Sequence, residues 1–370
     1  MDLFGDLPEP SSGNPTNSSA SLYDSIPASS NTSSLSLYDD LPTQSTPAKS
    51  TNIPSLVPSM KRKSEGTPCV IEKKLKSVKY EIDSYLAERQ GEREDMQDAH
   101  IIIQDFTSEI PDLHPEIYRV SLYGVFDGHG GIRASRFASQ NLHKNLRDKF
   151  PKGGIDIVER DIKKLFIDAF KKTDDDFLKQ ATKVKPVWKD GTTAILVLII
   201  NENMYIANIG DSQAVLCRVK DSTTECSAVP LSVPHNPSIY EERMRIQKQG
   251  GHVKDGRVMG VLEVSRSIGD GQYKKLGVTC TPDVKKCSLT DNDRYVIIAC
   301  DGLWKCFEPS DSIKFVNKIV EENKDKDVRV GKNVKNNKYD IACNQLANEA
   351  VLRFSGDNVT VLLLAIRKCR

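Results

Sequence analysis

Short apolar runs bounded by an aspartate beside a glycine are the feature that most constrains how this chain folds. The runs are of strand length and rich in β-branched and aromatic residues, which predicts β-strands. The dipeptides beside them are Asp127-Gly128, Gly210-Asp211, Asp301-Gly302 and Gly356-Asp357. A single aspartate beside a glycine is common in turns and would not by itself indicate a functional site. Because strand ends meet at one edge of a sheet stack, however, four of them predict carboxylates that converge on a single site.

Helical stretches separate these runs from about Tyr80 onward. We predict strands at 122–126, 194–200, 205–209, 214–217, 295–299 and 359–366. We predict helices at 133–150, 158–180, 238–249, 311–323 and 339–353. Short turns join two of the strand pairs, which favours antiparallel neighbours with helices on the outside of the sheets.

The balance of charges argues against some classes of function. The chain has 52 basic and 51 acidic residues and a net charge of +1, which is unlike a protein that mainly coats nucleic acid or an anionic membrane. The apolar run at 194–200 is too short to cross a bilayer, which takes about 20 residues. The first residues lack the basic and apolar regions of a secretory signal, so we expect a protein of the cytoplasm and nucleus.

Cysteine and histidine usage bears on metal binding. The chain has nine cysteines without a Cys-x-x-Cys motif and six scattered histidines, which argues against a disulfide framework or a zinc site. We therefore expect reduced thiols, and we expect oxygen atoms to hold any metal.

The first 60 residues differ in composition from the rest. They contain 15 serines and 8 of the 18 prolines, so 1–60 is predicted to be a disordered acidic tail. Three segments, 3–8, 22–27 and 37–42, share the order apolar, aromatic, two small or acidic residues, apolar, proline. They are either docking motifs for a partner or parts of a low-complexity tail in which aromatic residues recur by chance. The basic linker at 61–79 is either a two-part nuclear import signal or a solvated connection.

The converging carboxylates imply a particular chemistry. Two carboxylates about 4 Å apart repel by about 4 kcal/mol at an effective dielectric constant near 20, so such a cluster needs a cation. Oxygen ligands select hard ions such as Mg²⁺ or Mn²⁺. Two such ions that share a carboxylate can lower the pKa of a water and direct it at phosphorus. Hydrolysis of phosphate monoesters, which is very slow without a catalyst, requires this kind of electrostatic site.

Two other residues fit around the carboxylates. His129 lies beside Asp127 in the sequence, where an imidazole could protonate the leaving alkoxide, although it could also be a turn residue. Arg93 could clamp phosphate oxygens, although a lone arginine is more often a surface ion-pair partner. The glycines at 128–131 do not form a phosphate-binding P-loop, because no Gly-Lys-Ser follows them, and the kinase motifs are absent from the sequence.

The order of the motifs resembles the protein phosphatase 2C family, the metal-dependent serine/threonine phosphatases. The motifs are REDMQDAH at 93–100, YGVFDGHGG at 123–131, DGTTA at 190–194, ANIGDS at 207–212, GVLEVSRSIGD at 260–270, ACDGLW at 299–304 and SGDNVT at 355–360. The resemblance runs from about residue 77 to 370, which implies a catalytic domain at 80–370. It implies an α+β fold, a four-layer α/β/β/α sandwich of two mainly antiparallel sheets with a dimetal cleft between them.

The resemblance also implies which residues bind the metal ions. Asp127 is expected to bridge two Mg²⁺ or Mn²⁺ ions, and the carbonyl group of Gly128 to bind the second. Asp301 and Asp357 are expected to complete the first site. Asp211 corresponds to a ligand of a weaker third ion.

Other residues take supporting roles in the resemblance. His129 is expected to be the general acid, and Arg93 to bind the phosphate of the substrate. Asp98 and His100 match family positions near the metal waters and the cleft. Asn358 is expected to support the neighbouring Asp357.

Departures from the family pattern concern the metals and the substrate. Gln97 stands where many members have glutamate, and Lys305 where many have an acidic ligand of the third ion. We therefore expect a tighter first metal, and a third site that is weak or replaced by the lysine ammonium. A flap at about 235–265 is expected to influence substrate choice, and Pro234 makes it start differently. The lysine-rich and asparagine-rich segment at 324–338 is predicted to be a polar surface loop.

Three functions remain open at this point. The first is an active phosphatase of phosphoserine and phosphothreonine that acts in signalling, and the second is a catalytically weak scaffold of the same fold. The third, a metal-dependent nuclease, has little support from the near-neutral charge and the 6% aromatic content. The resemblance implies phosphoprotein substrates, a kinase or adaptor partner and a monomer, and we expect neither nucleic acid nor membrane as a partner.

Overall fold

The computed structural model describes residues 78–221, 223, 225–326 and 337–369. The predicted tail at 1–60, nearly all of the basic linker and most of the loop at 324–338 lie outside these residues, so those predictions are not tested by the structure. Within the described part of the chain, no helix is both long and apolar enough to span a membrane.

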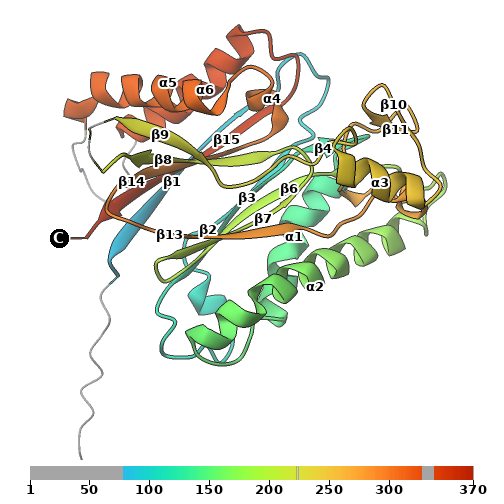
Figure 1. Ribbon diagram of the computed structural model, residues 1–370, viewed down its shortest axis with the longest axis horizontal. Helices are drawn as coiled ribbons and strands as arrows, with labels where there is room; N and C mark the ends of the chain where they lie inside the picture. Colours follow the sequence, from blue (N-terminus) through green and yellow to red (C-terminus); the bar gives the residue numbers. More distant parts are fainter. Residues whose placement is uncertain (1–77, 222, 224, 327–336, 370) are drawn as a thin grey trace, which may run out of the picture. The chain divides into compact units, whose positions relative to one another are not determined.

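Two five-stranded antiparallel sheets lie face to face at the centre of the fold (Figure 1). The first has the order β1-β15-β14-β8-β9, with β1 at Tyr80–Arg89, β15 at Val359–Lys368, β14 at Asp293–Ala299, β8 at Gln213–Val219 and β9 at Cys226–Pro230. The second has the order β13-β7-β6-β3-β2, with β13 at Asp283–Ser288, β7 at Asn203–Ile209, β6 at Ala194–Ile200, β3 at Val120–Phe126 and β2 at Ala99–Ile103.

Helices cover the outer face of each sheet (Figure 1). The second sheet carries α1 at Arg133–Asp148 and α2 at Ile155–Ala181, and the first carries α5 at Pro309–Glu322 and α6 at Lys338–Leu352. The single-turn helix α4, Asp301–Trp304, follows β14 directly. Three 3-10 turns lie at Thr107–Glu109, Lys274–Leu276 and Lys324–Lys326. The predicted four-layer α/β/β/α sandwich of two antiparallel sheets is therefore confirmed.

The central strands are apolar throughout because both of their faces are buried. In β6, Ile195, Val197 and Ile199 pack in the core between the sheets, whereas the alternate residues Leu196 and Leu198 pack under α1 and α2. The sequence of a strand that is covered on both faces is a continuous run of apolar residues. Polar groups are consequently confined to the strand ends, where the predicted aspartates lie.

Small elements surround one end of the two sheets. Strands β4 at Gly128–His129, β5 at Gly191–Thr192 and β12 at Ile268–Gly269 form a three-stranded sheet in the order β12-β5-β4. The segment predicted to be the flap contains the helix α3, Tyr240–Lys248, and the hairpin of β10 at Val253–Lys254 and β11 at Arg257–Val258. The flap segment and its neighbours share a small core of Ile246, Val258, Leu262, Val264 and Val278.

The six predicted strands and five predicted helices are all present, with ends shifted by a few residues. The four long strands that were not predicted are β1, β2, β9 and β13. These four are the edge strands of the two sheets. Edge strands have one side without a neighbour and tolerate charged residues, so β1 and β13 lack the apolar pattern that identified the others. Strands β2 and β9 carry no such charges but have only five residues each.

Candidate functional site

A cleft of about 400 Å³ lies where the ends of the central strands meet. All four predicted aspartates, Asp127, Asp211, Asp301 and Asp357, line it. The other predicted site residues that line it are Arg93, Gln97, Gly128, His129 and Asn358. The structure therefore brings together side chains that are more than 260 residues apart in the sequence, between Arg93 and Asp357.

Three of the carboxylates form a compact group. Asp127, Asp211 and Asp301 each offer one carboxylate oxygen, and these atoms lie within 4.8 Å of one another. The backbone N–H of Asp301, at the start of α4, also points at Oδ2 of Asp127, 3.5 Å away. An all-oxygen donor set of this size suits a hard divalent cation.

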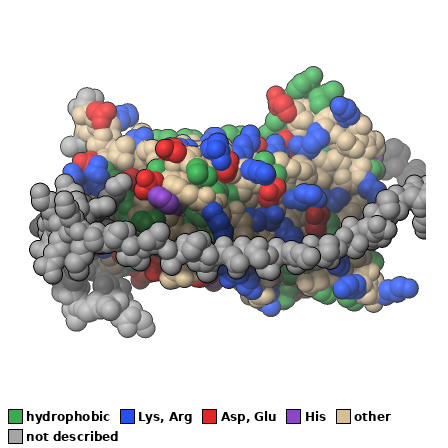
Figure 2. All heavy atoms as spheres, turned by 90° about the horizontal axis from the view of Figure 1, so that it is seen from below, with side chains coloured by type: hydrophobic (Ala, Val, Ile, Leu, Met, Phe, Trp, Pro, Cys, Tyr) green, Lys and Arg blue, Asp and Glu red, His purple; other side chains and the backbone are tan. Residues whose placement is uncertain are grey.

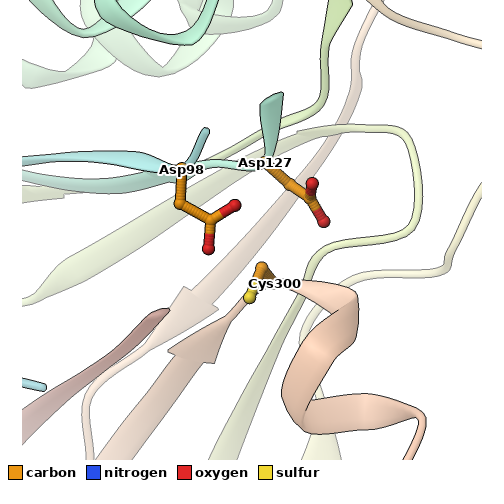
Figure 3. A group of neighbouring side chains, drawn as sticks. All are labelled: Asp98, Asp127 and Cys300. Atoms are coloured by element: carbon orange, nitrogen blue, oxygen red, sulfur yellow. The ribbon is translucent and has the colours of Figure 1, made fainter. Parts of the chain in front are cut away.

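A second group of possible metal ligands shares Asp127 with the first. Figure 3 shows the side chains of Asp98, Asp127 and Cys300 facing one another, and one ligand atom of each lies within the same 4.8 Å. Asp98 accepts a hydrogen bond from Thr360 Oγ1 at 2.7 Å, and Cys300 Sγ accepts one from the Thr360 backbone N–H at 3.1 Å. Because Thr360 already engages both of these groups, the Asp127–Asp211–Asp301 group is the better cation site.

The carboxylates of the site have perturbed protonation equilibria. Burial and the neighbouring charge of Asp301 raise the pKa of Asp127 well above its ordinary value. The same two causes raise the pKa of Asp211 to about 7. Burial, only partly offset by the hydrogen bond from Thr360, raises the pKa of Asp98 to about 7. The protein alone does not fully compensate these negative charges, so the residues present fit a divalent cation.

The backbone at Asp127 is held by the 190–194 motif. The N–H of Thr193 donates to the carbonyl oxygen of Asp127 at 2.9 Å, and Thr193 Oγ1 accepts from the N–H of Asp127 at 3.2 Å. The same hydroxyl lies 2.8 Å from Ser212 Oγ, next to Asp211. Thr193 therefore sets the spacing between the strand ends that carry Asp127 and Asp211.

Close backbone packing explains the glycine at position 128. A Cβ atom there would lie 2.2 Å from the carbonyl oxygen of Gln97, so a side chain does not fit. The N–H of Gln97 donates to Asn358 Oδ1 at 2.7 Å, and Asn358 Nδ2 donates to the carbonyl oxygens of Gln90 and Asp95. Asn358 thus ties the loop that carries Arg93 and Gln97 to the turn that carries Asp357.

Asp357 is paired with two cations. Its Oδ2 lies 3.0 Å from Arg93 Nη2 and 3.1 Å from Lys305 Nζ. Lys305 Nζ also lies 2.6 Å from Asp301 Oδ2. Burial alone would raise the pKa of Asp357, but Lys305 and Arg93 outweigh burial and lower it. Lys305 therefore contacts the two residues expected to complete the first metal site.

His129 is positioned by a residue that the sequence did not single out. Its Nε2 lies 2.7 Å from Oδ2 of the buried Asp270, which also accepts a hydrogen bond from Ser267 Oγ at 2.6 Å. A Cβ atom on Gly191 would lie 2.2 Å from both His129 Nε2 and Asp270 Oδ2, so this pairing requires glycine there. Burial lowers the pKa of His129, but Asp270 outweighs burial and raises it.

The sequence held two signals for Asp270. It is the last residue of the 260–270 motif that carries the family resemblance, and it belongs to a Gly-Asp pair like Gly210-Asp211. No apolar run precedes it, so the strand-end pattern did not include it. His100, in contrast, lies outside the cleft. It belongs to the edge strand β2, and its Nδ1 lies 2.8 Å from Glu88 Oε1 on β1 of the other sheet.

A buried ion-pair network anchors the flap segment beside the cleft. The carboxylate of Glu242 accepts hydrogen bonds from Arg245 at 2.8 Å, Arg266 at 2.7 Å and Ser265 at 2.5 Å. Burial opposes the charge of Glu242, but the two arginines outweigh burial and lower its pKa. Val261 and Leu262, from the same segment, supply an apolar wall of the cleft.

Comparison with known proteins gives consistent matches. Residues 82–359 match the family described as Protein phosphatase 2C. The human protein named integrin-linked kinase-associated serine/threonine phosphatase 2C is 50% identical over 391 residues, which cover 99% of this chain and 100% of that protein. Probable protein phosphatase 2C 8 from Arabidopsis thaliana is 36% identical over 271 residues, 70% of this chain and 74% of that protein.

A solved structure shows the same fold. The crystal structure of a serine-threonine phosphatase 2C from Toxoplasma gondii has a TM-score of 0.63 at 17% identity, and the match covers 77% of this chain and 95% of that one. The fold and the sequence matches define a protein serine/threonine phosphatase. The chain belongs to the protein phosphatase 2C family, as the motifs predicted. That family is metal-dependent, and the acidic groups of this cleft are able to bind metal.

The raised pKa of Asp211 predicts how stability depends on pH without metal. The carboxyl group ionises at about pH 4 in the unfolded chain but at about pH 7 in the folded protein, so folding is penalised as pH rises through this window. We expect the Tm in EDTA to fall from pH 4.5 to 7.5, and Asp211→Asn to reduce that fall by at least about 2 °C.

Thermal unfolding of both proteins across this pH range checks the prediction. Asp311→Asn, which changes an exposed carboxylate on α5, is the control and should follow the wild type. A fall of equal size in wild type and Asp211→Asn would show that Asp211 carries no such penalty.

Proposed function

We propose that this protein hydrolyses phosphoserine and phosphothreonine in signalling proteins by direct attack of a water activated by Mg²⁺ or Mn²⁺. The observation that carries the proposal is the group of Asp127, Asp211 and Asp301, whose carboxylate oxygens lie within 4.8 Å of one another in the cleft. A catalytically weak scaffold is not favoured, because the relatives are named as phosphatases and the acidic group is intact.

In this proposal, different acidic residues of the cleft would bind different metal ions. Asp127 would hold two ions jointly, with Asp301 and Asp357 completing the first site and the carbonyl oxygen of Gly128 contributing to the second. Asp211 would contribute to a weak third site. When bound, such ions supply Lewis acidity and a water of lowered pKa, the nucleophile for hydrolysis.

Arg93 and His129 act on the substrate in this proposal. Arg93 is half exposed at the cleft, where its guanidinium can bind two phosphate oxygens at once. His129 holds its Nε2 against Asp270, which leaves Nδ1 as the nitrogen that passes a proton to the leaving serine or threonine oxygen. Asp270 is a positioning residue in this proposal, because it acts through the imidazole that it orients.

The partners follow from the relatives and from the surface. The 50% identical relatives are named for association with integrin-linked kinase, so we propose that kinase, or another kinase or adaptor, as a partner of this protein. Figure 2 shows basic and acidic side chains on the same face, with several basic ones gathered along its middle. The proposal that nucleic acid and membranes are not partners rests on the near-neutral net charge of the chain, +1. We propose a monomer that works in both cytoplasm and nucleus.

Phosphate release from a phosphothreonine peptide tests the proposed activity. We expect turnover with Mn²⁺ or Mg²⁺ that EDTA abolishes. Asp301→Asn should lower kcat by at least about 100-fold, because it removes an electrostatic contact made in the transition state. The variant should still fold, since Asp301 lies at a strand end outside the core. Turnover that EDTA leaves unchanged, or full activity of Asp301→Asn, would contradict the proposal.

The role of the histidine is tested by changing the leaving group. A general acid contributes about 10² to 10⁴ in rate when the leaving group is poor. We expect His129→Ala and Asp270→Asn to lower kcat strongly with a phosphoserine peptide but much less with nitrophenyl phosphate, whose leaving group needs little protonation. His143→Ala, in α1 and away from the cleft, is the control. Equal losses with both substrates would argue against proton donation by His129.

A further inference from the structure

Lys305 is placed by local geometry against the acidic group of the cleft. Asp301 opens the single-turn helix α4, and Lys305 follows it by four residues, so both side chains lie on one face of the turn. The ammonium lies 2.6 Å from Asp301 Oδ2 and 3.1 Å from Asp357 Oδ2. One lysine therefore joins carboxylates from α4 and from the turn before β15.

Two other basic residues that line the cleft form different ion pairs. Arg93 pairs with Asp357 alone, and Arg257 pairs with Glu263 of the flap segment. Among the described basic residues of the lining, Lys305 is the one whose ion pair reaches a member of the Asp127–Asp211–Asp301 group. Its positive charge is thus the nearest compensation that the chain itself provides for that group.

We propose that Lys305 is a built-in cation that replaces a metal ion between Asp301 and Asp357 in the metal-free protein and must be displaced before that site fills. The inference rests on the proposed metal-dependent function. Lysine suits this role because its ammonium is a compact charge on a flexible stem, and about half of this side chain is exposed, so it can swing out of the cleft. The competition then weakens the expected first metal site, whereas the sequence alone predicted a tighter first metal and placed the effect of Lys305 at the third.

Two consequences separate this role from that of an ordinary surface ion pair. A surface pair contributes little to stability, so its removal changes neither folding nor metal binding measurably. A built-in cation keeps the carboxylates together when metal is absent, so its loss should destabilise the metal-free protein. The ammonium also occupies the carboxylates of Asp301 and Asp357 part of the time. The apparent affinity for the ion is then the intrinsic affinity multiplied by the fraction of time that these carboxylates are free.

Mn²⁺ titration of the metal-free, full-length protein tests the proposal without using activity as a readout. Lys305→Met removes the charge and keeps an apolar stem, and Lys305→Gln removes the charge and keeps a polar end. We expect either variant to bind Mn²⁺ about tenfold more tightly by calorimetry. We expect its Tm in EDTA to fall by at least about 2 °C, and this deficit to disappear in saturating Mn²⁺.

Lys314→Met is the matched control. Lys314 pairs with Asp311 at 3.0 Å on α5, so this variant also breaks a lysine–aspartate pair but one outside the cleft. Mn²⁺ affinities that are equal in the wild type, Lys305→Met and Lys305→Gln would overturn the role of Lys305 and leave the proposed phosphatase intact. A folded wild type that binds no Mn²⁺ would instead overturn both.

Discussion

Repulsion among the carboxylates at the strand ends is the constraint on which the rest of the site depends. Asp127, Asp211 and Asp301 place oxygens within 4.8 Å of one another, and at an effective dielectric constant near 20 each close pair of charges costs about 4 kcal/mol. The rigid sandwich, with both faces of its central strands buried, holds them there nonetheless. The surrounding residues either reduce this repulsion, as Lys305 does, or fix the spacing, as Thr193 does. A divalent cation is the ligand that relieves it most.

The predicted part of the fold is the part whose burial shows in the residue pattern. Strand β6 is apolar at every position because Ile195 and Leu196 face different cores, and its run was recognised with both ends correct. Edge strand β13, Asp283–Ser288, has two lysines and an aspartate and is largely exposed, so nothing in its composition indicates a strand. Its place is set by pairing with β7, a long-range contact that sequence periodicity does not contain.

The site residues were also predictable from the sequence only in part. Aspartates that end apolar runs were identified because the strands that carry them are easy to recognise. Asp270 was not, since it reaches His129 through the small β12-β5-β4 sheet, whose two-residue strands leave no pattern. The position of His100 outside the cleft follows from its pairing with Glu88 on the opposite sheet, which again depends on tertiary structure. Side chains that act through another residue are therefore the ones that sequence alone does not reveal.

Metal binding by the carboxylates of the cleft can be tested by anomalous X-ray scattering from crystals grown with Mn²⁺, which locates the ions independently of any assay. We expect anomalous peaks in the cleft, within bonding distance of carboxylate oxygens of Asp127 and Asp301. Crystals that show the same fold and ordered carboxylates, but no anomalous peak in the cleft at saturating Mn²⁺, would contradict this expectation.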